Sequence, residues 1–356
     1  MRIAVIGVGL IGGSIALAAR SRLGASVAGF DSDPQALAQA IERGVVDTRC
    51  ENVEQAVADA EAVFVATPVG VLPEAVAAVL KAAPDSAVVT DVGSTKRTIV
   101  AQQDDPRFVG GHPLAGAETA GVRYARADLF AGATWYLTPT AITSGVLYER
   151  LYRLLHSLGA RPAAIEPDVH DAILASVSHL PHVLANVLVS QAASQLAAGG
   201  QRLPAAGPSF RDATRVAGAP STIWTDIYVS NSDALITAID DTVIGLQRTR
   251  AALAKADRAW IQDWNEQAAA DRRRLLEADL AGAELFELRA SVPNRPGVIA
   301  QLALELGRAG VNIADMALYP APDMSEGVVA LWISGSDAAA RAQQLVDGLG
   351  FPVARA

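Results

Sequence analysis

Three segments of the sequence carry histidine, arginine and carboxylate side chains at spacings suited to chemistry. The first, residues 110–118, sets His112 among small residues, with Pro113 and Gly116 shaping a tight loop. Small neighbours indicate close packing by backbone or by a ligand. A histidine titrates near physiological pH, so His112 can serve as a general base or hydrogen-bond acceptor. An ordinary capped loop histidine is the equally open alternative.

The second segment, residues 176–182, places His179 and His182 three positions apart, on one face of an expected helix. Asp171 precedes His179 by eight positions and falls near the same stripe. Two histidines at this spacing can bind a metal, but no accompanying cysteine or carboxylate ligand pattern supports that role. We expect an anion-binding or orienting role, with an interface histidine as the alternative.

The third segment, residues 209–217, follows a Gly-Pro loop and contains Arg211, Asp212 and Arg215. An arginine fork matches a carboxylate through two hydrogen bonds, and Asp212 can hold one of the arginines in place. An ordinary surface ion pair is the alternative. The chain has 38 acidic and 29 basic residues and a net charge of −9, so an anionic substrate needs such a local cluster of cations.

A glycine-rich turn near the N-terminus predicts a dinucleotide site. The apolar run Arg2–Ile6 meets Gly7-Val8-Gly9-Leu10-Ile11-Gly12, and a second apolar run after a helical stretch ends on Asp31. In this pattern the first glycine allows the turn, the second lets backbone approach a pyrophosphate, and the third lets helix and strand pack closely. The following helix N-terminus attracts the phosphates.

Asp31 indicates which dinucleotide binds. Its carboxylate can accept hydrogen bonds from both ribose hydroxyls of NAD, and it would repel the 2′-phosphate of NADP. Thr67 and Ser94 follow two further expected strands, at the sheet edge where ligands of open α/β sheets bind. The expected NAD-binding residues are Gly7, Gly9, Leu10, Ile11, Gly12, Asp31, Thr67 and Ser94.

Length and composition narrow the class of protein. A chain of 356 residues with 51% hydrophobic residues predicts two or three domains. A single cysteine, Cys50, argues against a disulfide framework and a cysteine-based zinc site. The acidic net charge argues against nucleic acid as a partner. We see no apolar run near the roughly 20 residues of a membrane span and no signal peptide, and we expect a cytoplasmic protein.

The order of patterns predicts three domains. Strand-like runs alternate with helical patterns in residues 1–166, which predicts a Rossmann-type α/β domain with a parallel sheet. Residues 167–282 are almost entirely helical, and residues 283–356 return to a small α+β domain of β-α-β-β-α order. The expected strands of the first domain are Ile3–Ile6, Val27–Phe30, Ala62–Ala66, Ala87–Thr90, Phe108–Gly110, Trp135–Thr138 and Ala163–Ile165.

Within the helical domain, Asp168 is a plausible N-cap for a long helix to about Leu196, which Pro181 should kink. A Gly- and Pro-rich loop follows over Ala197–Pro208. Long apolar helices beyond a nucleotide domain often dimerise, and we favour a dimer over a monomeric helical cap. The further expected helices are Ile223–Val229, Ser232–Lys255 and Trp260–Leu280.

The last domain has its own alternation of elements. Its expected elements are a strand at Leu285–Ser291, a turn at Pro293–Gly297, a helix at Val298–Ala309, strands at Val311–Ile313 and Gly327–Ile333, and a helix at Ser336–Leu349.

Taken together, these motifs resemble the prephenate/arogenate dehydrogenase family of tyrosine biosynthesis, over the whole chain. The last domain resembles an ACT domain, an amino-acid-sensing module, through residues 296–300 and 311–313. The motifs that carry the family resemblance are Gly7-Val8-Gly9-Leu10-Ile11-Gly12-Gly13-Ser14, Asp91-Val92-Gly93-Ser94-Thr95-Lys96, Gly111-His112-Pro113-Leu114-Ala115-Gly116, Ser178-His179-Leu180-Pro181-His182, and Thr214-Arg215-Val216-Ala217 with Trp224 downstream.

The resemblance implies NAD-dependent oxidative decarboxylation of prephenate to 4-hydroxyphenylpyruvate and CO2. By matching motifs, His112 accepts the proton of the substrate hydroxyl, and Ser94 supports His112 near the nicotinamide. Arg215 binds a substrate carboxylate, while His182 and His179 help to orient the anion.

Two further positions of the resemblance bear on its substrate and effector sites. Glu118 matches a position that gates or lines the site, and Ala117 stands where relatives can carry a hydroxyl residue. In the last domain, Asn294 stands where sensing domains often have Asp. The resemblance also implies feedback control by an amino acid, with tyrosine the expected effector.

Three alternatives stay open. An arogenate dehydrogenase differs only in its substrate, which bears an amino group in place of the keto oxygen. A β-hydroxyacid dehydrogenase relies on a lysine in its helical domain, and residues 166–250 contain none. A non-catalytic amino-acid sensor would not need the intact glycine turn, Asp31, His112 and Arg215.

Overall fold

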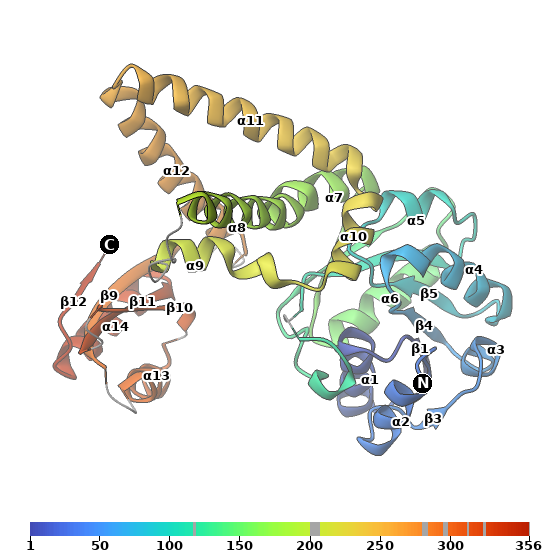
Figure 1. The fold of residues 1–356 in the computed structure, drawn as a ribbon. Coiled ribbons are helices and arrows are strands. Elements are labelled where there is room, and N and C mark those ends of the chain that lie inside the picture. The colour runs from blue at the N-terminus through green and yellow to red at the C-terminus, as the bar shows by residue number, and fades with distance from the viewer. Residues whose placement is uncertain are drawn as a thin grey trace. The chain divides into compact units, whose positions relative to one another are not determined.

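The computed structural model describes residues 1–116, 119–199, 207–279, 284–294, 298–311, 313–322 and 325–355. The chain divides into two compact units, Met1–Val243 and Ile244–Ala356, with the division inside one long helix. Each unit has its own sheet and its own core, and the ribbon of each can be followed in Figure 1.

The first unit is built on an eight-stranded sheet of order β3-β2-β1-β4-β5-β6-β7-β8. Every strand expected from the sequence is present within a few residues, and the two-residue strand β3 is an addition. The strands are β1 (Arg2–Ile6), β2 (Ser26–Phe30), β3 (Thr48–Arg49), β4 (Ala62–Val65), β5 (Val88–Asp91), β6 (Phe108–Pro113), β7 (Thr134–Thr138) and β8 (Arg161–Ala164).

The sheet is parallel except at one pairing. The strands β3-β2-β1-β4-β5-β6, in sheet order, run parallel to one another, as expected for a Rossmann-type domain. Strand β7 pairs antiparallel with β6. The expected parallel sheet is therefore confirmed except at the β6–β7 pair. The physical reason is the connection. The described residues between β6 and β7 form a loop and a short 3-10 turn (Val122–Tyr124), whereas a parallel crossover usually needs a helix.

Helices cover both faces of this sheet, as the alternation along β1 shows. Ile3 and Val5 lie in one buried cluster, and Ala4 and Ile6 lie in the other. Helices α1, α2 and α6 contribute to the first cluster, and α3, α4 and α5 to the second. Their bounds are α1 (Leu10–Leu23), α2 (Pro34–Glu42), α3 (Val53–Val57), α4 (Leu72–Ala82), α5 (Arg97–Ala101) and α6 (Gly145–Ser157), with a 3-10 turn at Val69–Val71.

The helical segment begins two residues earlier than expected. Glu166 is the N-cap and Pro167 takes the first helical position, where its missing N–H costs nothing, so Asp168 lies inside the first turn. Four helices of this segment lie in the first unit among the described residues, and a fifth begins in it. The helices are α7 (Pro167–Leu174), α8 (Leu180–Gly199), α9 (Pro208–Thr214), α10 (Ser221–Ser230) and α11 (Ser232–Ala254), with a 3-10 turn at Arg215–Gly218.

Between α7 and α8 the helix passes through a π-helical turn, Ala175–His179, which ends just before Pro181. A proline inside a helix removes one hydrogen bond, and its ring crowds the carbonyl four residues back. A wider turn relieves that crowding and is a common cause of bending. The irregularity expected at Pro181 therefore takes the form of a π turn, and His179 lies within it.

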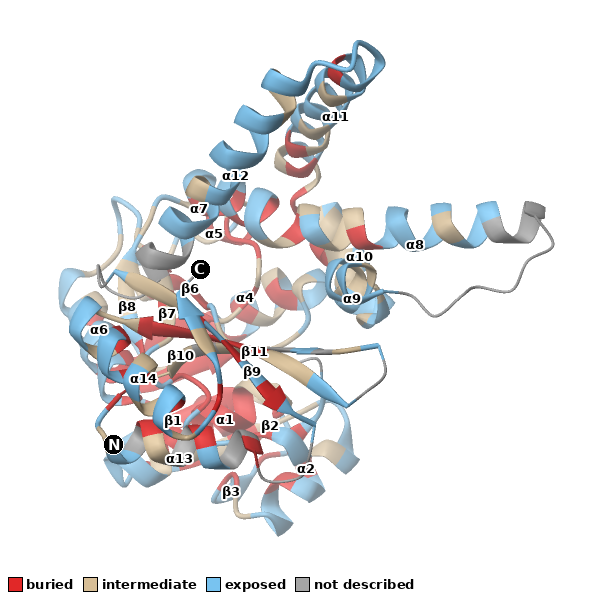
Figure 2. Cartoon of the chain, turned by 90° about the vertical axis from the view of Figure 1, so that its left-hand side faces the viewer, coloured by how far each residue is buried: buried red, intermediate tan, exposed pale blue. Residues whose placement is uncertain are grey.

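The combined helix Pro167–Gln195 is long and apolar enough, by length and composition alone, to cross a membrane. The helix is not one uninterrupted apolar run, so the absence of such a run from the sequence did not predict it. A helix of a soluble protein can pass the same test, and here His170, Asp171 and His179 are buried in polar contacts. Much of α8 is exposed, as Figure 2 shows, including Val187 and Leu188.

The second unit contains a four-stranded antiparallel sheet of order β10-β11-β9-β12, with two helices packed in its core. The β-α-β-β-α order expected from the sequence is present, and β12 completes it as a β-α-β-β-α-β unit. The elements are α12 (Arg258–Asp279), β9 (Leu285–Pro293), α13 (Val298–Arg308), β10 (Ile313–Pro320), β11 (Glu326–Ser334), α14 (Ser336–Gly348) and β12 (Val353–Arg355).

Candidate active site

The glycine turn between β1 and α1 has room for a dinucleotide. Gly7 adopts a φ of +92°, and a Cβ on Gly12 would lie 2.0 Å from the backbone oxygen of Gly7, so the fold itself requires both glycines. A Cβ on Gly9 would meet no atom of the described residues within 4 Å. Packing among these residues therefore does not explain Gly9, whereas close approach of a pyrophosphate does.

Two neighbouring groups also fit a dinucleotide. The Oδ2 atom of Asp31 accepts a hydrogen bond from the amide of Val8 at 2.7 Å, which fixes the carboxylate beside the glycine turn. Each carboxylate oxygen keeps further acceptor capacity for ribose hydroxyls. After β4, the Thr67 hydroxyl is buried with no hydrogen-bond partner among the described residues. A buried polar group without a partner is costly, so Thr67 is a candidate to bond a ligand.

His112, at the end of β6, is held by a partner that the sequence analysis did not single out. Its Nδ1 atom lies 2.9 Å from Nε2 of His170 on α7, and Nδ1 of His170 lies 2.8 Å from Oδ1 of Asp171. All three side chains are buried. Burial, with His170, Lys96 and His179 close by, holds the pKa of His112 well below its usual range, so the ring is a neutral base.

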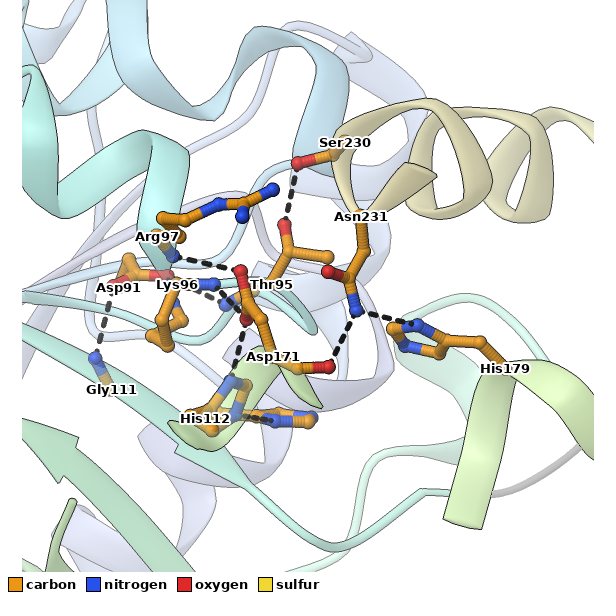
Figure 3. A network of polar contacts seen from close by, with 12 residues as sticks. Asp91, Thr95, Lys96, Arg97, Gly111, His112, Asp171, His179, Ser230 and Asn231 are labelled. Carbon is orange, nitrogen blue, oxygen red and sulfur yellow. Dashed lines mark hydrogen bonds and ion pairs between the residues drawn. The ribbon is translucent and has the colours of Figure 1, made fainter. Parts of the chain in front are cut away.

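Asp171 lies at the centre of the polar network (Figure 3). Its two carboxylate oxygens accept the backbone amides of Lys96 and Arg97 at 2.8 and 2.9 Å. Burial by itself raises the pKa of this carboxyl group, but the hydrogen bonds from His170 and these two amides lower it overall. Asp171 is therefore ionised although it is buried.

A buried ion pair between Lys96 and Asp91 lies next to His112. Lys96 donates to Oδ2 of Asp91 at the end of β5, and Oδ1 of Asp91 accepts the amide of Gly111, next to His112, at 3.0 Å. Burial lowers the pKa of Lys96, and Asp91 opposes that shift. Ser94 lies in the loop between Asp91 and Lys96, but among the described residues no hydrogen bond joins it to His112.

His179 reaches the same network through Asn231, which lies between α10 and α11. The Nδ2 atom of Asn231 donates to the backbone oxygen of Asp171 at 2.8 Å and lies 3.1 Å from Nδ1 of His179. Because Nδ1 accepts from the amide, the hydrogen of the neutral ring is on Nε2, which is buried without a partner among the described residues. Burial lowers the pKa of His179 to about 4.

A pocket of about 850 Å³ adjoins these residues. The His182 ring stacks on Trp224, with ring centroids 3.4 Å apart, and the His179 ring meets the same indole edge-on at 6.1 Å. Arg215 supplies a permanent cation, while burial lowers the pKa of His182 and favours its neutral form. The main lining residues are Gly116, Thr119, Ala120, His182, Arg215, Ile223 and Trp224.

The structure thus brings together the three segments expected to carry chemistry. A chain of contacts runs from His112 through Asp171 and Asn231 to His179, and from there through Trp224 to His182. Glu118 and Ala117 lie outside the described residues. Arg211 and Asp212 lie on α9 and do not line this pocket.

Sequence reasoning missed His170, Lys96 and Asn231 as members of the network. The signal that could have found His170 is its position beside Asp171, nine residues before His179 on the same expected helix. Within the described part of the chain, no group of three or more His, Cys, Asp or Glu side chains has a metal-binding arrangement.

The glycine turn and the helical pocket together place the chain among dinucleotide-dependent dehydrogenases whose substrate site is completed by helices beyond the nucleotide-binding sheet. Residues 15–164 match the family model for the nucleotide-binding domain of prephenate dehydrogenase, and residues 166–266 match the model for its dimerization domain. The chain belongs to the prephenate dehydrogenase family.

Individual relatives agree with this assignment. A prephenate dehydrogenase of Bacillus subtilis (strain 168) is 32% identical over 97% of this chain and 95% of its own length. The structure is similar to that of prephenate dehydrogenase from A. aeolicus in complex with hydroxyphenyl propionate and NAD+, with a TM-score of 0.71 and 26% identity over 77% of this chain and 98% of that one. It is also similar to Synechocystis arogenate dehydrogenase, with a TM-score of 0.67 and 28% identity over 77% of this chain and all of that one.

Proposed function

We propose that this chain catalyses the NAD-dependent oxidative decarboxylation of prephenate to 4-hydroxyphenylpyruvate and CO2. The observation that carries the proposal is a buried, neutral imidazole, His112, linked by continuous contacts to a pocket that contains Arg215. Membership of the family and the fit of the glycine turn to a dinucleotide support the same reaction.

The reaction needs three things from the protein: a proton acceptor, an anion site and alignment of the substrate with the cofactor. His112 takes the proton of the ring hydroxyl, which pushes electrons toward release of hydride from the carbon that bears it. Bound NAD supplies the hydride acceptor. Loss of the ring carboxylate as CO2 makes the ring aromatic and the step strongly downhill.

The remaining residues hold the two ligands. Arg215 binds a substrate carboxylate, and His182 and His179 offer hydrogen bonds that orient the anion. Gly7, Gly9, Leu10, Ile11 and Gly12 form the pyrophosphate cradle, Asp31 binds the ribose, and Thr67 and Ser94 lie at the nicotinamide end. Glu118 gates or lines the site in this proposal.

Prephenate is proposed in preference to arogenate on the chemistry of the pocket. Arogenate differs by an ammonium group, which binds best beside a carboxylate. Among the described residues that line the 850 Å³ pocket there is no aspartate or glutamate, whereas Arg215 and His182 suit a keto acid. Glu118 lies outside the described residues, and its carboxylate would favour arogenate if it faced that ammonium group.

The experiment is NADH absorbance with prephenate and with arogenate, side by side, on the wild type and on His112→Asn. We expect higher kcat/KM for prephenate, and a loss of about 10²–10⁴-fold in kcat in the variant. His156→Asn, at an exposed histidine on α6, is the matched control. Equal or better turnover of arogenate would overturn the choice of substrate, and similar rates in both proteins would remove His112 from the mechanism.

We also propose that the enzyme is a homodimer formed through the helical domain, residues 167–282. The support is the exposed apolar surface of the long helix, which includes Val177, Val187 and Leu188, together with the family model for a dimerization domain. Light scattering at micromolar concentration would detect the dimer. A monomer with full activity would contradict it.

Finally, we propose that residues 283–356 form an ACT-like regulatory domain that binds tyrosine. It follows the nucleotide-binding domain of residues 1–166 and the helical domain of residues 167–282. The support is its β-α-β-β-α-β order and its antiparallel sheet β10-β11-β9-β12. Inhibition of the full chain by tyrosine, alongside phenylalanine as a control, tests this. The cytoplasm remains the predicted compartment.

A further inference from the structure

His170 and Asp171 form a relay behind His112 that the proposed reaction does not use directly. The relay has two links, of 2.9 Å between Nδ1 of His112 and Nε2 of His170 and 2.8 Å between Nδ1 of His170 and Oδ1 of Asp171. His170 is completely buried and Asp171 is 1% exposed. Neither residue is among those that line the substrate pocket.

We infer that His170 and Asp171 are positioning residues that fix His112 as its Nδ1–H tautomer and so make Nε2 the nitrogen that accepts the substrate proton. The inference rests on the proposed function for the identity of that proton, but the tautomer itself can be measured without any substrate.

The direction of each hydrogen bond follows from what each group can donate. The carboxylate of Asp171 only accepts, because it is ionised and takes hydrogen bonds from the amides of Lys96 and Arg97. Nδ1 of His170 therefore carries a hydrogen. In the neutral ring Nε2 then has only a lone pair, so His112 must donate from Nδ1. The lone pair of His112 is thereby left on Nε2.

The relay also provides a negative charge where one is needed during the reaction. As the O–H bond of the substrate breaks, its proton forms a bond with Nε2 of His112, and the electron pair left on oxygen drives hydride out of the adjoining C–H bond to the bound NAD. When the ring carboxylate leaves as CO2, its electron pair passes through the ring to that oxygen, which takes the proton back as the phenol is released. Between these two proton transfers His112 is an imidazolium. It donates from Nδ1 to His170, which donates in turn to the carboxylate of Asp171, and the negative charge of that carboxylate stabilises the imidazolium.

Other groups near His112 work against that imidazolium. Lys96 faces it from the loop before α5, whereas His170 on α7 and His179 in the π turn add positive charge only in their protonated forms. Asp91 is already paired with Lys96. The carboxylate of Asp171, delivered through His170, is therefore the charge that offsets these neighbours, in the manner of an acid that holds a catalytic imidazole in one tautomer.

Two substitutions at one position separate this role from simple packing. His170→Phe keeps a ring against Tyr136, whose ring lies 5.7 Å away, but removes the acceptor for Nδ1 of His112. His170→Gln places an amide oxygen near the position of Nε2 and restores an acceptor. We expect kcat to fall about 10²–10⁴-fold in the Phe variant with KM for prephenate within threefold of wild type, and Gln to recover at least tenfold of that loss.

A spectroscopic measurement completes the test and does not depend on turnover. The chain has five histidines, so ¹⁵N labelling of the rings can be assigned by single substitutions. Wild type should show His112 protonated at Nδ1, and the Phe variant should show a mixture of tautomers. His156→Phe, at the exposed histidine, should leave both kcat and the His112 signal unchanged.

The outcomes distinguish the two proposals. A wild-type chain that does not turn over prephenate contradicts the proposed function and leaves the tautomer to be read from the spectrum. A wild-type His112 protonated at Nε2 overturns the inference, whatever the activity. So does a His170→Phe enzyme that keeps its kcat, or one whose only change is in KM. If the Phe variant does not fold, the spectrum of wild type and the Gln variant still decide.

Discussion

The amide nitrogen of Asn231 lies 2.8 Å from the backbone oxygen of Asp171 and 3.1 Å from Nδ1 of His179. The buried side chain of Asn231 thus links the start of α11 to both α7 and the π turn by hydrogen bonds. The same bond decides which nitrogen of His179 carries the hydrogen. Asn231 consequently has two roles, in stability and in the presentation of His179 to a ligand.

Substitution of Asn231 by Ala should therefore affect folding and binding together. Nδ1 of His179 loses its donor, whereas the backbone oxygen of Asp171 keeps a hydrogen bond from the amide of Ala175. One unsatisfied buried group costs about 1–3 kcal/mol, so the free energy of unfolding should fall by at least about 1 kcal/mol. KM for prephenate should also rise, because His179 is no longer held in one tautomer. Urea unfolding and steady-state kinetics measure the two effects.

The matched control is Asn265→Ala on α12, where the side chain is exposed and bonds only to its own helix. That substitution should change the free energy of unfolding by no more than about 0.5 kcal/mol. Equal effects of the two substitutions would show that the bond to His179 contributes little.

Acid should destabilise the folded state through His179. Its pKa is about 4 in the folded chain, because burial disfavours the charged ring, against 6.5 in an unfolded chain. Above pH 6.5 the ring is neutral in both states. Below it the unfolded chain binds a proton that the folded chain does not, so stability falls between pH 6.5 and pH 4 by about 3 kcal/mol.

The contribution of this one ring is measured as a difference between two proteins. Urea unfolding of wild type and His179→Phe at pH 7 and pH 4.5 should show a smaller loss of stability in the variant. His156→Phe, at an exposed ring, should lose as much as wild type. Parallel losses in all three proteins would contradict the assignment of this pH dependence to His179.

Alanine at two glycines of the same turn should have opposite consequences. At Gly9 an added Cβ meets no atom within 4 Å in the part of the chain that the structure describes, so Gly9→Ala should fold with wild-type stability but bind NAD more weakly. At Gly12 the Cβ would lie 2.0 Å from the backbone oxygen of Gly7, so Gly12→Ala should lose stability. Thermal unfolding and titration with NAD separate the two. A Gly9→Ala protein with unchanged affinity for NAD would show that the pyrophosphate lies elsewhere.

Much of the first unit could be predicted from the sequence because its signals are local. The strand before Gly7, the helix after it and the strand that ends at Asp31 are each visible within a few residues. The antiparallel pairing of β7 could not be read in this way, because it depends on the direction in which the chain returns along β6 after its loop.

The candidate site was predictable in its outer parts and not in its interior. His112, His179, His182 and Arg215 stand in compact motifs, and their residue types suggest chemistry. The partner of His112 is 58 residues away in the sequence, on a helix whose packing against β6 follows only from the whole fold. Asn231 looks like a loop residue between two helices, and only its complete burial reveals its role.

Cofactor preference gives the last prediction. The carboxylate of Asp31 is fixed by amides of Val8 at 2.7 Å and Asp33 at 2.8 Å, so it cannot easily turn away from a 2′-phosphate. Repulsion between two such charges near a protein surface amounts to a few kcal/mol, so kcat/KM should favour NAD over NADP by about 100-fold or more. Asp31→Asn removes the charge and should narrow this ratio at least tenfold. Asp33→Asn, which alters the exposed N-cap of α2 two residues away, should leave the ratio unchanged. Comparable kcat/KM of the wild type with NADP and with NAD would instead mean that Asp31 only stabilises the glycine turn and does not face the ribose.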